Sequence, residues 1–221
     1  AMTMLLGGEV GTIYPSAAER VEEPPKPFVL PPIHSDMRRV YAYLVKHRNI
    51  DRSVVAHFAR EKLLYEDAKY HNAVFVGTDE EGIPRHAHKR STNSYGKAFR
   101  LNVEGCDPRY SFHHIGTDGS LYVFEAPIDL MSYLTLHRDM VNAVALCGLY
   151  DGALQAYLQA HPEIRRIALC LDADEPGEKA AQQLQEKYQL QGYAVTVEKP
   201  RCGKDWNEYL QRKICLSLIH I

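Results

Sequence analysis

The second half of the chain alternates short apolar runs with segments of helical periodicity. The apolar runs cover residues 121–125, 142–147, 166–172 and 193–197. The segments that follow them predict helices at residues 128–137, 152–160, 175–188 and 205–212. Strands separated by single helices require right-handed crossovers, so this half predicts an α/β fold with a mainly parallel sheet covered by helices on both faces.

The first half has a different pattern. Residues 1–34 hold half of the prolines and lack any sustained period, which predicts an extended arm or linker. Helical patterns follow at residues 36–47, with Ser35 as the expected N-cap, and from Asp51 onward. Strand-like runs at residues 72–77 and 84–91 flank a turn at residues 79–82. These elements predict a smaller N-terminal α+β domain over residues 35–115.

Composition bounds the classes of protein that remain. With 221 residues, 45% of them hydrophobic, the chain can bury one substantial core or two small ones, and no segment is long enough to span a bilayer. The net charge of −2 neither requires nor excludes a nucleic-acid partner. The five cysteines are scattered without a C-x-x-C pair, which argues against a disulfide framework and a zinc ribbon. We therefore expect a reducing, cytoplasmic location and no membrane partner.

Three carboxylates stand at the ends of two apolar runs. Glu125 ends the first run of the second half, and Asp172 and Asp174 end the third. The carboxyl ends of parallel strands meet at one edge, and buried acids there need a cation, so the pattern predicts a site for Mg²⁺. Each acid also has a structural alternative. Asp174 could be the N-cap of the next helix, and Glu125 could be an acid favoured by a helix dipole.

This half contains four short motifs: VFEAPID at residues 123–129, ALCGL at 145–149, LDADEPG at 171–177 and GKD at 203–205. Together they resemble a Toprim domain, the metal-binding catalytic module shared by bacterial primases, topoisomerases and certain nucleases. The resemblance spans residues 119–213. Upstream, RRVYAYL at residues 38–44, LLYE at 63–66, HNAVFV at 71–76 and PRHAHKR at 84–90 resemble the DUF3991 domain that precedes Toprim in primase-like proteins of bacterial mobile elements.

The Toprim resemblance implies a role for each acid. Glu125 matches the glutamate proposed as general acid/base, and Asp172 and Asp174 match the metal-binding aspartates. Asp205 matches, more loosely, a further acid near a second ion. The implied cofactor is Mg²⁺ or Mn²⁺, which prefers oxygen ligands and can bridge carboxylates to phosphate oxygens.

Basic residues supply the expected contacts to template and nucleotide. The candidates are Arg85, Lys89, Arg90, Lys97, Arg100 and Lys204. Most of them lie in a segment that resembles the ridge by which primases hold template and incoming nucleotide, although exposed basic residues on a hairpin are also typical of an ordinary solvated face.

The resemblance favours a DNA primase-like nucleotidyltransferase in the replication of a bacterial mobile element. Its partners would be single-stranded DNA and nucleoside triphosphates, and a helicase or relaxase partner is compatible with that role. A Toprim metal-dependent nuclease and a non-catalytic nucleic-acid-binding module stay open as alternatives. The Cys/His pattern of the primase zinc-binding domain is missing, so we expect either a fragment of a longer protein or a partner that reads DNA. The apolar tail at residues 214–221 has no assigned role; if it folds, it would add an edge strand or promote self-association.

Overall fold

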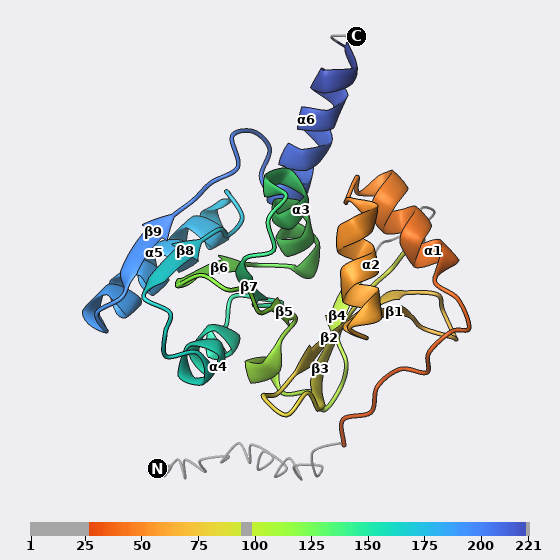
Figure 1. The fold of residues 1–221 in the computed structure, drawn as a ribbon, viewed down its shortest axis with the longest axis horizontal. Coiled ribbons are helices and arrows are strands. Elements are labelled where there is room, and N and C mark those ends of the chain that lie inside the picture. Colours follow the sequence, from red (N-terminus) through yellow and green to blue (C-terminus); the bar gives the residue numbers. More distant parts are fainter. Residues whose placement is uncertain (1–26, 94–98, 220–221) are drawn as a thin grey trace, which may run out of the picture.

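The computed structural model of the chain describes residues 27–93 and 99–219 (Figure 1). Within these residues the strands form two sheets. One is four-stranded with the order β1-β2-β3-β4, and the other is five-stranded with the order β5-β7-β6-β8-β9. Figure 1 shows the first sheet together with α1 and α2 on one side of the molecule, and α4 and α5 with the second sheet on the other side.

Two short helical segments and one longer helix follow the extended residues 27–37. They are α1 (Arg38–Tyr41), its continuation η1 with π-helical hydrogen bonds (Ala42–His47), and α2 (Arg52–Arg60). The prediction that Ser35 is the N-cap is wrong. Met37 occupies that position, and Oδ1 of Asp36 accepts the N–H of Arg38 (3.1 Å). The start of α2 at Asp51 agrees with the pattern, because the Asp51 carboxylate accepts the N–H of Ser53 (2.7 Å).

The N-terminal sheet is antiparallel throughout. Its strands are β1 (Leu64–Glu66), β2 (Ala73–Thr78), β3 (Pro84–Arg90) and β4 (Arg100–Asn102). Phe75 on β2 pairs with His88 on β3 and belongs to the main core, whereas Val74 and Ala87 pack in a small cluster on the opposite face. Since side chains alternate along a strand, Arg90 shares the face of His88.

The second sheet is parallel except at one edge. Its parallel strands are β6 (Ser120–Phe124), β7 (Asn142–Ala145), β8 (Arg166–Leu169) and β9 (Ala194–Val197), and β5 (His113–His114) pairs antiparallel with β7. The intervening and following helices are α3 (Pro127–His137), α4 (Gly152–Ala160), α5 (Glu175–Leu190) and α6 (Trp206–Ile219). The predicted α/β class with a mainly parallel sheet and a smaller N-terminal α+β part is confirmed; the edge strand β5 was not predicted.

Two hydrophobic cores lie on the two faces of the parallel sheet. On one face, Leu121 and Leu169 pack with α4 and α5. On the other face, Phe124 packs with α3 and α6, and the same cluster continues through Phe58 of α2 to Phe75 of β2. The N-terminal sheet and helices thus share a core with the parallel sheet. The division of the chain at residues 115–119 stays a prediction.

The last helix differs from the expectation for the tail. α6 runs to Ile219, so most of the tail is helical and does not form the edge strand that was one of its two expected roles; self-association stays a prediction. Ile214 packs against the main core, while Leu216 is exposed. Within residues 27–93 and 99–219, no helix combines the length and the apolar character that crossing a membrane requires.

Candidate metal and nucleotide site

Glu125 and Asp172 follow two neighbouring strands of the parallel sheet. β6 and β8 pair in parallel with Val123 opposite Leu169, so the residues after both strands emerge at the same edge. Asp174 caps α5, because its Oδ1 accepts the N–H of Gly177 (3.0 Å). The N-cap alternative therefore describes a real hydrogen bond of Asp174. It does not exclude metal binding, since a carboxylate offers two oxygens.

A close approach of helix and strand end positions this edge. A Cβ atom on Gly177 would lie 2.2 Å from the carbonyl oxygen of Asp172. Only glycine leaves room there for the backbone of Asp172, although Gly177 lies inside the first turn of α5. The glycine of the LDADEPG motif therefore sets how closely α5 approaches the acidic segment.

The loop before α6 is tied to the same segment. The N–H of Ala173 donates to the carbonyl of Lys204 (2.6 Å), which brings Asp205 next to Asp172 and Asp174. Oδ1 of Asp205 in turn accepts the N–H of Glu208 (2.7 Å) at the start of α6. Two segments that lie far apart in the sequence thereby present their acids to one place.

Burial and mutual repulsion shift the titration of these acids. Asp172 is 7% exposed, and burial, followed by the charges of Glu125 and Asp205, raises its pKa to about 6. Burial likewise raises the pKa of Glu125. Two cations lie close by: the Lys204 ammonium is 3.7 Å from Asp172 Oδ2, and the Arg100 guanidinium is 3.7 Å from Glu125 Oε1. The site concentrates negative charge that these two solvent-facing cations offset only in part.

A polar cleft of about 360 Å³ opens beside these acids. Its lining carries charges of both signs, from Arg48, Arg90, Arg100, Lys204, Asp129, Asp172, Asp205 and Glu208. Glu125 lines an adjoining pocket of about 220 Å³, and His88 and Arg100 line both cavities. The cleft lies where the N-terminal sheet faces the carboxyl edge of the parallel sheet, so both parts of the chain build it.

Three of the predicted basic residues reach this cleft. They are Arg90 from β3, Arg100 from β4 and Lys204 from the loop before α6. Nε of Arg90 donates to the hydroxyl of Tyr43 (3.3 Å), and Nε of Arg48 donates to the same oxygen (3.0 Å). The tyrosine thus orients two guanidinium groups toward one cavity.

The other predicted basic residues lie elsewhere. Nε of Arg85 donates to Oδ2 of Asp79 (2.7 Å), and Arg85 lines a different surface hollow. Lys89 stands on the β3 face opposite to that of His88 and lines neither cavity of the site. Lys97 lies outside the described residues. The contacts predicted for these three residues stay predictions.

Two further residues of the site were not among its predicted residues, although Asp129 closes the VFEAPID motif. Asp129 in α3 is buried, and its Oδ1 accepts the backbone N–H of Asn207 (3.1 Å). Burial, with the charges of Asp205 and Asp172, raises the pKa of Asp129 well above its ordinary range. Asn207 also donates to the carbonyl of Arg48 (2.8 Å). The sequence signal for these residues is weak: the pattern around Asp129 indicates a structural acid, and the Asn207–Arg48 contact joins distant segments.

The cleft acids stand around the cavity without forming a closed cage. Among residues 27–93 and 99–219, only His34, Glu66 and His71 bring three candidate ligand atoms within 4.8 Å of one another. Mg²⁺ retains several waters and takes one or two carboxylates directly, so it does not require three ligand atoms that close together. Asp172 and Asp205 line the cleft, whereas Asp174 lines neither the cleft nor the adjoining pocket. The donor set, all oxygen, fits Mg²⁺ or Mn²⁺.

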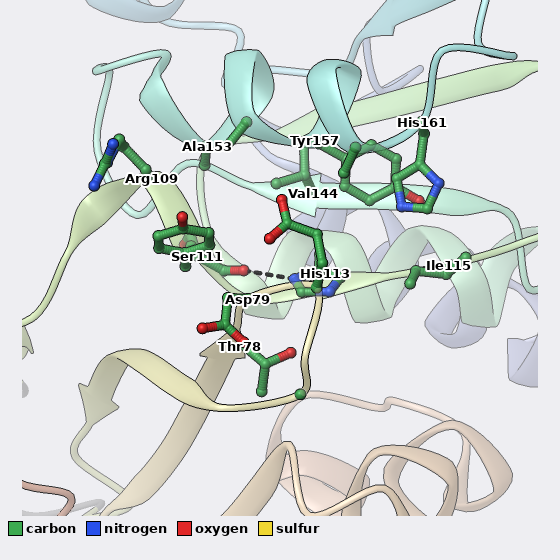
Figure 2. Close-up of a pocket in the computed structure, with 15 residues that line it drawn as sticks. Thr78, Asp79, Arg109, Ser111, His113, Ile115, Val144, Ala153, Tyr157 and His161 are labelled. Atoms are coloured by element: carbon green, nitrogen blue, oxygen red, sulfur yellow. Dashed lines mark hydrogen bonds between the residues drawn. The ribbon is translucent and has the colours of Figure 1, made fainter.

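A separate cavity of about 210 Å³ lies against α4 (Figure 2). Tyr157 and His161 of α4 and His113 of β5 line it, and the dashed line in Figure 2 marks the contact between His113 Nδ1 and the carbonyl of Ser111 (2.9 Å). Its described lining includes none of the predicted site residues. The largely apolar cavity and the acidic cleft are therefore distinct.

Comparison with family models assigns the two parts of the chain to known domains. The model described as "Protein of unknown function (DUF3991)" matches residues 42–118, and the "Toprim-like" model matches residues 122–210. The chain therefore carries a DUF3991 region followed by a Toprim-like domain. Both resemblances drawn from the sequence motifs are confirmed.

Solved structures give the same assignment at the level of fold. The primase fragment of the bacteriophage T7 primase-helicase protein superposes with a TM-score of 0.56 and 16% identity, over 79% of this chain and 72% of that one. The Aquifex aeolicus primase gives a TM-score of 0.58 and 18% identity, over 82% of this chain and 55% of that one. The Escherichia coli primase catalytic core gives a TM-score of 0.54 and 15% identity, over 80% of this chain and 69% of that one. The fold is that of bacterial and phage primase catalytic cores.

Two curated relatives share part of their sequence with this chain. An uncharacterized protein of Bacillus anthracis is 26% identical over 211 residues, which cover 79% of this chain and 57% of that protein. An uncharacterized protein of Mycoplasma genitalium is 30% identical over 122 residues, covering 52% of this chain and 55% of that protein. The chain spans about half the length of the curated relatives it matches.

Proposed function

We propose that this chain is the catalytic part of a primase-like nucleotidyltransferase that joins nucleoside triphosphates on a single-stranded DNA template. The observation that carries the proposal is the meeting of acids and cations at one cleft. Glu125 and Asp172 follow adjacent parallel strands, and Arg90, Arg100 and Lys204 face the same space. Carboxylates that hold Mg²⁺ beside cations that hold phosphate are the parts that phosphoryl transfer requires.

The acids divide into metal ligands and a proton carrier under this proposal. Asp172, Asp174 and Asp205 would hold Mg²⁺ or Mn²⁺, which when bound would offset charge on phosphate oxygens. The raised pKa of Glu125 suits it to hold or release a proton nearer neutral pH, so it would serve as general acid/base. Arg100, 3.7 Å from Glu125, would contact a phosphate in the same pocket.

The expected ligands follow from what proteins of similar fold bind. One similar structure contains T7 primase domains bound to an RNA/DNA hybrid and dTTP, and another is a DnaG primase catalytic domain bound to single-stranded DNA. By analogy we infer single-stranded DNA and nucleoside triphosphates as ligands here, a helicase or relaxase as partner, and a cytoplasmic role in replicating a bacterial mobile element. Residues 35–115 would hold the template and residues 119–213 the metal.

A primer-synthesis assay tests the proposal. Labelled nucleoside triphosphates, Mn²⁺ and a single-stranded template should yield oligomers with the unaltered chain. Glu125→Gln should lower the rate about 100-fold or more while Mn²⁺ affinity is kept, because it removes only the proton carrier. Asp172→Asn combined with Asp174→Asn should abolish Mn²⁺ binding. The matched control is Asp139→Asn, an exposed acid beyond the other end of α3, which should change neither quantity.

Three outcomes would overturn the proposal. Loss of template without oligomer synthesis would identify a metal-dependent nuclease. Template binding without any chemistry would identify a binding module. Unchanged Mn²⁺ affinity after substitution of both Asp172 and Asp174 would remove the metal site on which the proposal depends.

A further inference from the structure

Two histidines and one buried glutamate meet at the start of the fold, away from the cleft. His34, Glu66 and His71 each offer a ligand atom within 4.8 Å of those of the other two. Nδ1 of His71 lies 2.6 Å from Oε1 of Glu66, and the two imidazole rings are 4.7 Å apart. None of the three lines the cleft or its adjoining pocket, so the cluster plays no part in the proposed function.

The carboxylate of Glu66 is held in place by the backbone. It is 1% exposed, and its Oε2 accepts the N–H groups of Arg39 (3.0 Å) and Val40 (3.2 Å) at the start of α1. Oε1 is thereby directed toward His71. A buried carboxylate with one oxygen on amides and the other on imidazole is ready to share that second oxygen with a cation.

The histidines stand on equally well anchored backbone. His34 donates its N–H to the carbonyl of Glu66 (2.8 Å), and the N–H of His71 donates to the carbonyl of Asp67 (3.0 Å). Nδ1 of His34 lies 3.1 Å from both the carbonyl oxygen and the backbone nitrogen of Asp36, so the tautomer of His34 decides whether Nδ1 donates to the first or accepts from the second. A histidine that donates Nδ1–H to a backbone carbonyl keeps the Nε2 lone pair for a metal, which is the usual arrangement around metal-bound histidines.

We propose that His34, Glu66 and His71 form a metal site for a divalent ion of the zinc class. Two imidazoles and one carboxylate are ligands that zinc accepts and that Mg²⁺ does not favour. Three protein ligands leave one position for water. The three ligand atoms lie within 4.8 Å of one another, whereas ligand atoms of a tetrahedral zinc lie about 3.4 Å apart, so metal binding requires the two partly exposed rings to turn.

The site joins three segments that already share backbone hydrogen bonds. His34 belongs to the extended segment before α1, Glu66 ends β1, and His71 precedes β2. The carbonyl of His71 also accepts the hydroxyl of Thr92 (2.7 Å), just after β3. A bound ion would therefore hold the extended segment before α1 against the N-terminal sheet.

Zinc content tests the proposal. The full chain is loaded with Zn²⁺, freed of excess metal by gel filtration and measured by elemental analysis, in a background of Asp172→Asn and Asp174→Asn that removes two of the three aspartates proposed to hold the cleft metal. About one Zn²⁺ per chain is expected in that background. His34→Ala and His71→Ala should each lose it, whereas His47→Ala, an exposed histidine at the end of η1, should keep it.

Thermal unfolding supplies the second measurement. Because an ion that binds only the folded state raises its stability, Zn²⁺ should raise the Tm of the background protein and of His47→Ala but not of His34→Ala. His34 is partly exposed, so His34→Ala is the variant that keeps the test open if His71→Ala does not fold. Equal zinc content in His34→Ala and its parent, or no zinc uptake by the parent, would overturn the site and leave the cleft proposal untouched.

Discussion

Burial shifts the pKa of the acids and the pKa of the histidines in opposite directions. It raises the pKa of Asp172 to about 6 and lowers the pKa of His86 to about 4. In both cases the charged form is the one that burial disfavours. At neutral pH His86 is therefore an uncharged core residue, while Asp172 is a charged one that a divalent cation would stabilise.

The burial of His86 predicts that the folded chain loses stability at acidic pH. It is fully buried, and neither ring nitrogen has a hydrogen-bond partner, since the Asn102 side chain hydrogen-bonds His88 instead. Its folded-state pKa lies below the unfolded value, so stability is complete above about pH 6.5 and is lost as the pH falls toward 4, by on the order of 2 kcal/mol at pH 5. His86→Leu should remove that part of the loss.

Urea unfolding at pH 7 and pH 5 measures the effect. The difference between the two pH values should shrink in His86→Leu and stay unchanged in His47→Leu, whose parent side chain is exposed. An identical pH difference in His86→Leu and the unaltered chain would show that His86 does not titrate as its burial requires.

At the scale of elements, helix starts position the acids. α5 begins at Glu175 directly after Asp174, and α6 begins at Trp206 directly after Asp205. Both helices also pack against the parallel sheet, through Leu184 in α5 and Trp206 in α6. The indole N–H of Trp206 donates to the carbonyl of Cys170 (3.0 Å), which ties α6 to the end of β8. The carboxylates thus stand on helix ends that the core holds.

Gly177→Ala tests how tightly α5 is seated. Alanine normally stabilises a helix relative to glycine by about 1 kcal/mol, yet here its Cβ would meet the Asp172 carbonyl at 2.2 Å. We expect a net loss of about 1–3 kcal/mol and weaker Mn²⁺ binding, because the clash displaces either α5 or Asp172. Thermal unfolding and Mn²⁺ titration measure both.

Gly119→Ala is the matched control for that change. A Cβ there would meet its nearest atom, the Glu163 carbonyl, at an ordinary 3.7 Å. Its effect on Mn²⁺ binding should be negligible. If Gly177→Ala were as stable as the parent and bound Mn²⁺ equally well, the close approach would not position the site.

At the scale of the whole molecule, one core joins the two sheets. Leu44 near the N-terminus and Trp206 in the last helix belong to the same cluster of buried residues. Asn207 adds a polar link, because its amide donates to the carbonyl of Arg48 (2.8 Å). Unfolding of the N-terminal part would expose the face of the parallel sheet that α3 and α6 cover only in part.

The shared core predicts one cooperative unfolding transition. Leu44→Ala should lower the free energy of unfolding by about 2–5 kcal/mol, since Leu44 is fully buried. The loss should appear equally in far-UV circular dichroism and in the fluorescence of Trp206, the single tryptophan. Leu190→Ala, at a 90% exposed position, should shift neither curve. Two separate transitions, with Trp206 insensitive to Leu44→Ala, would instead show independent domains.

The sequence alone determined the α/β class, the parallel strands and the place of the acids. These depend on local periodicity and on the rule that parallel strands end at one edge, so Glu125 and Asp172 could be placed on adjoining sides of one site from the pattern of residues. The small-residue and acidic motifs identified the Toprim resemblance because each of them is a short run of neighbouring residues, and they follow one another along the chain in the order that this module has.

Only the tertiary structure decided which basic side chains line the cleft and which histidines lie close together. Alternation along β3 sends Arg90 to the cleft and Lys89 to the other face, and pairing with β4 adds Arg100. His34 and His71 meet only because the extended segment docks beside β1. Such contacts join residues far apart in the chain, so they follow from packing of one element on another and leave no periodic trace in the sequence.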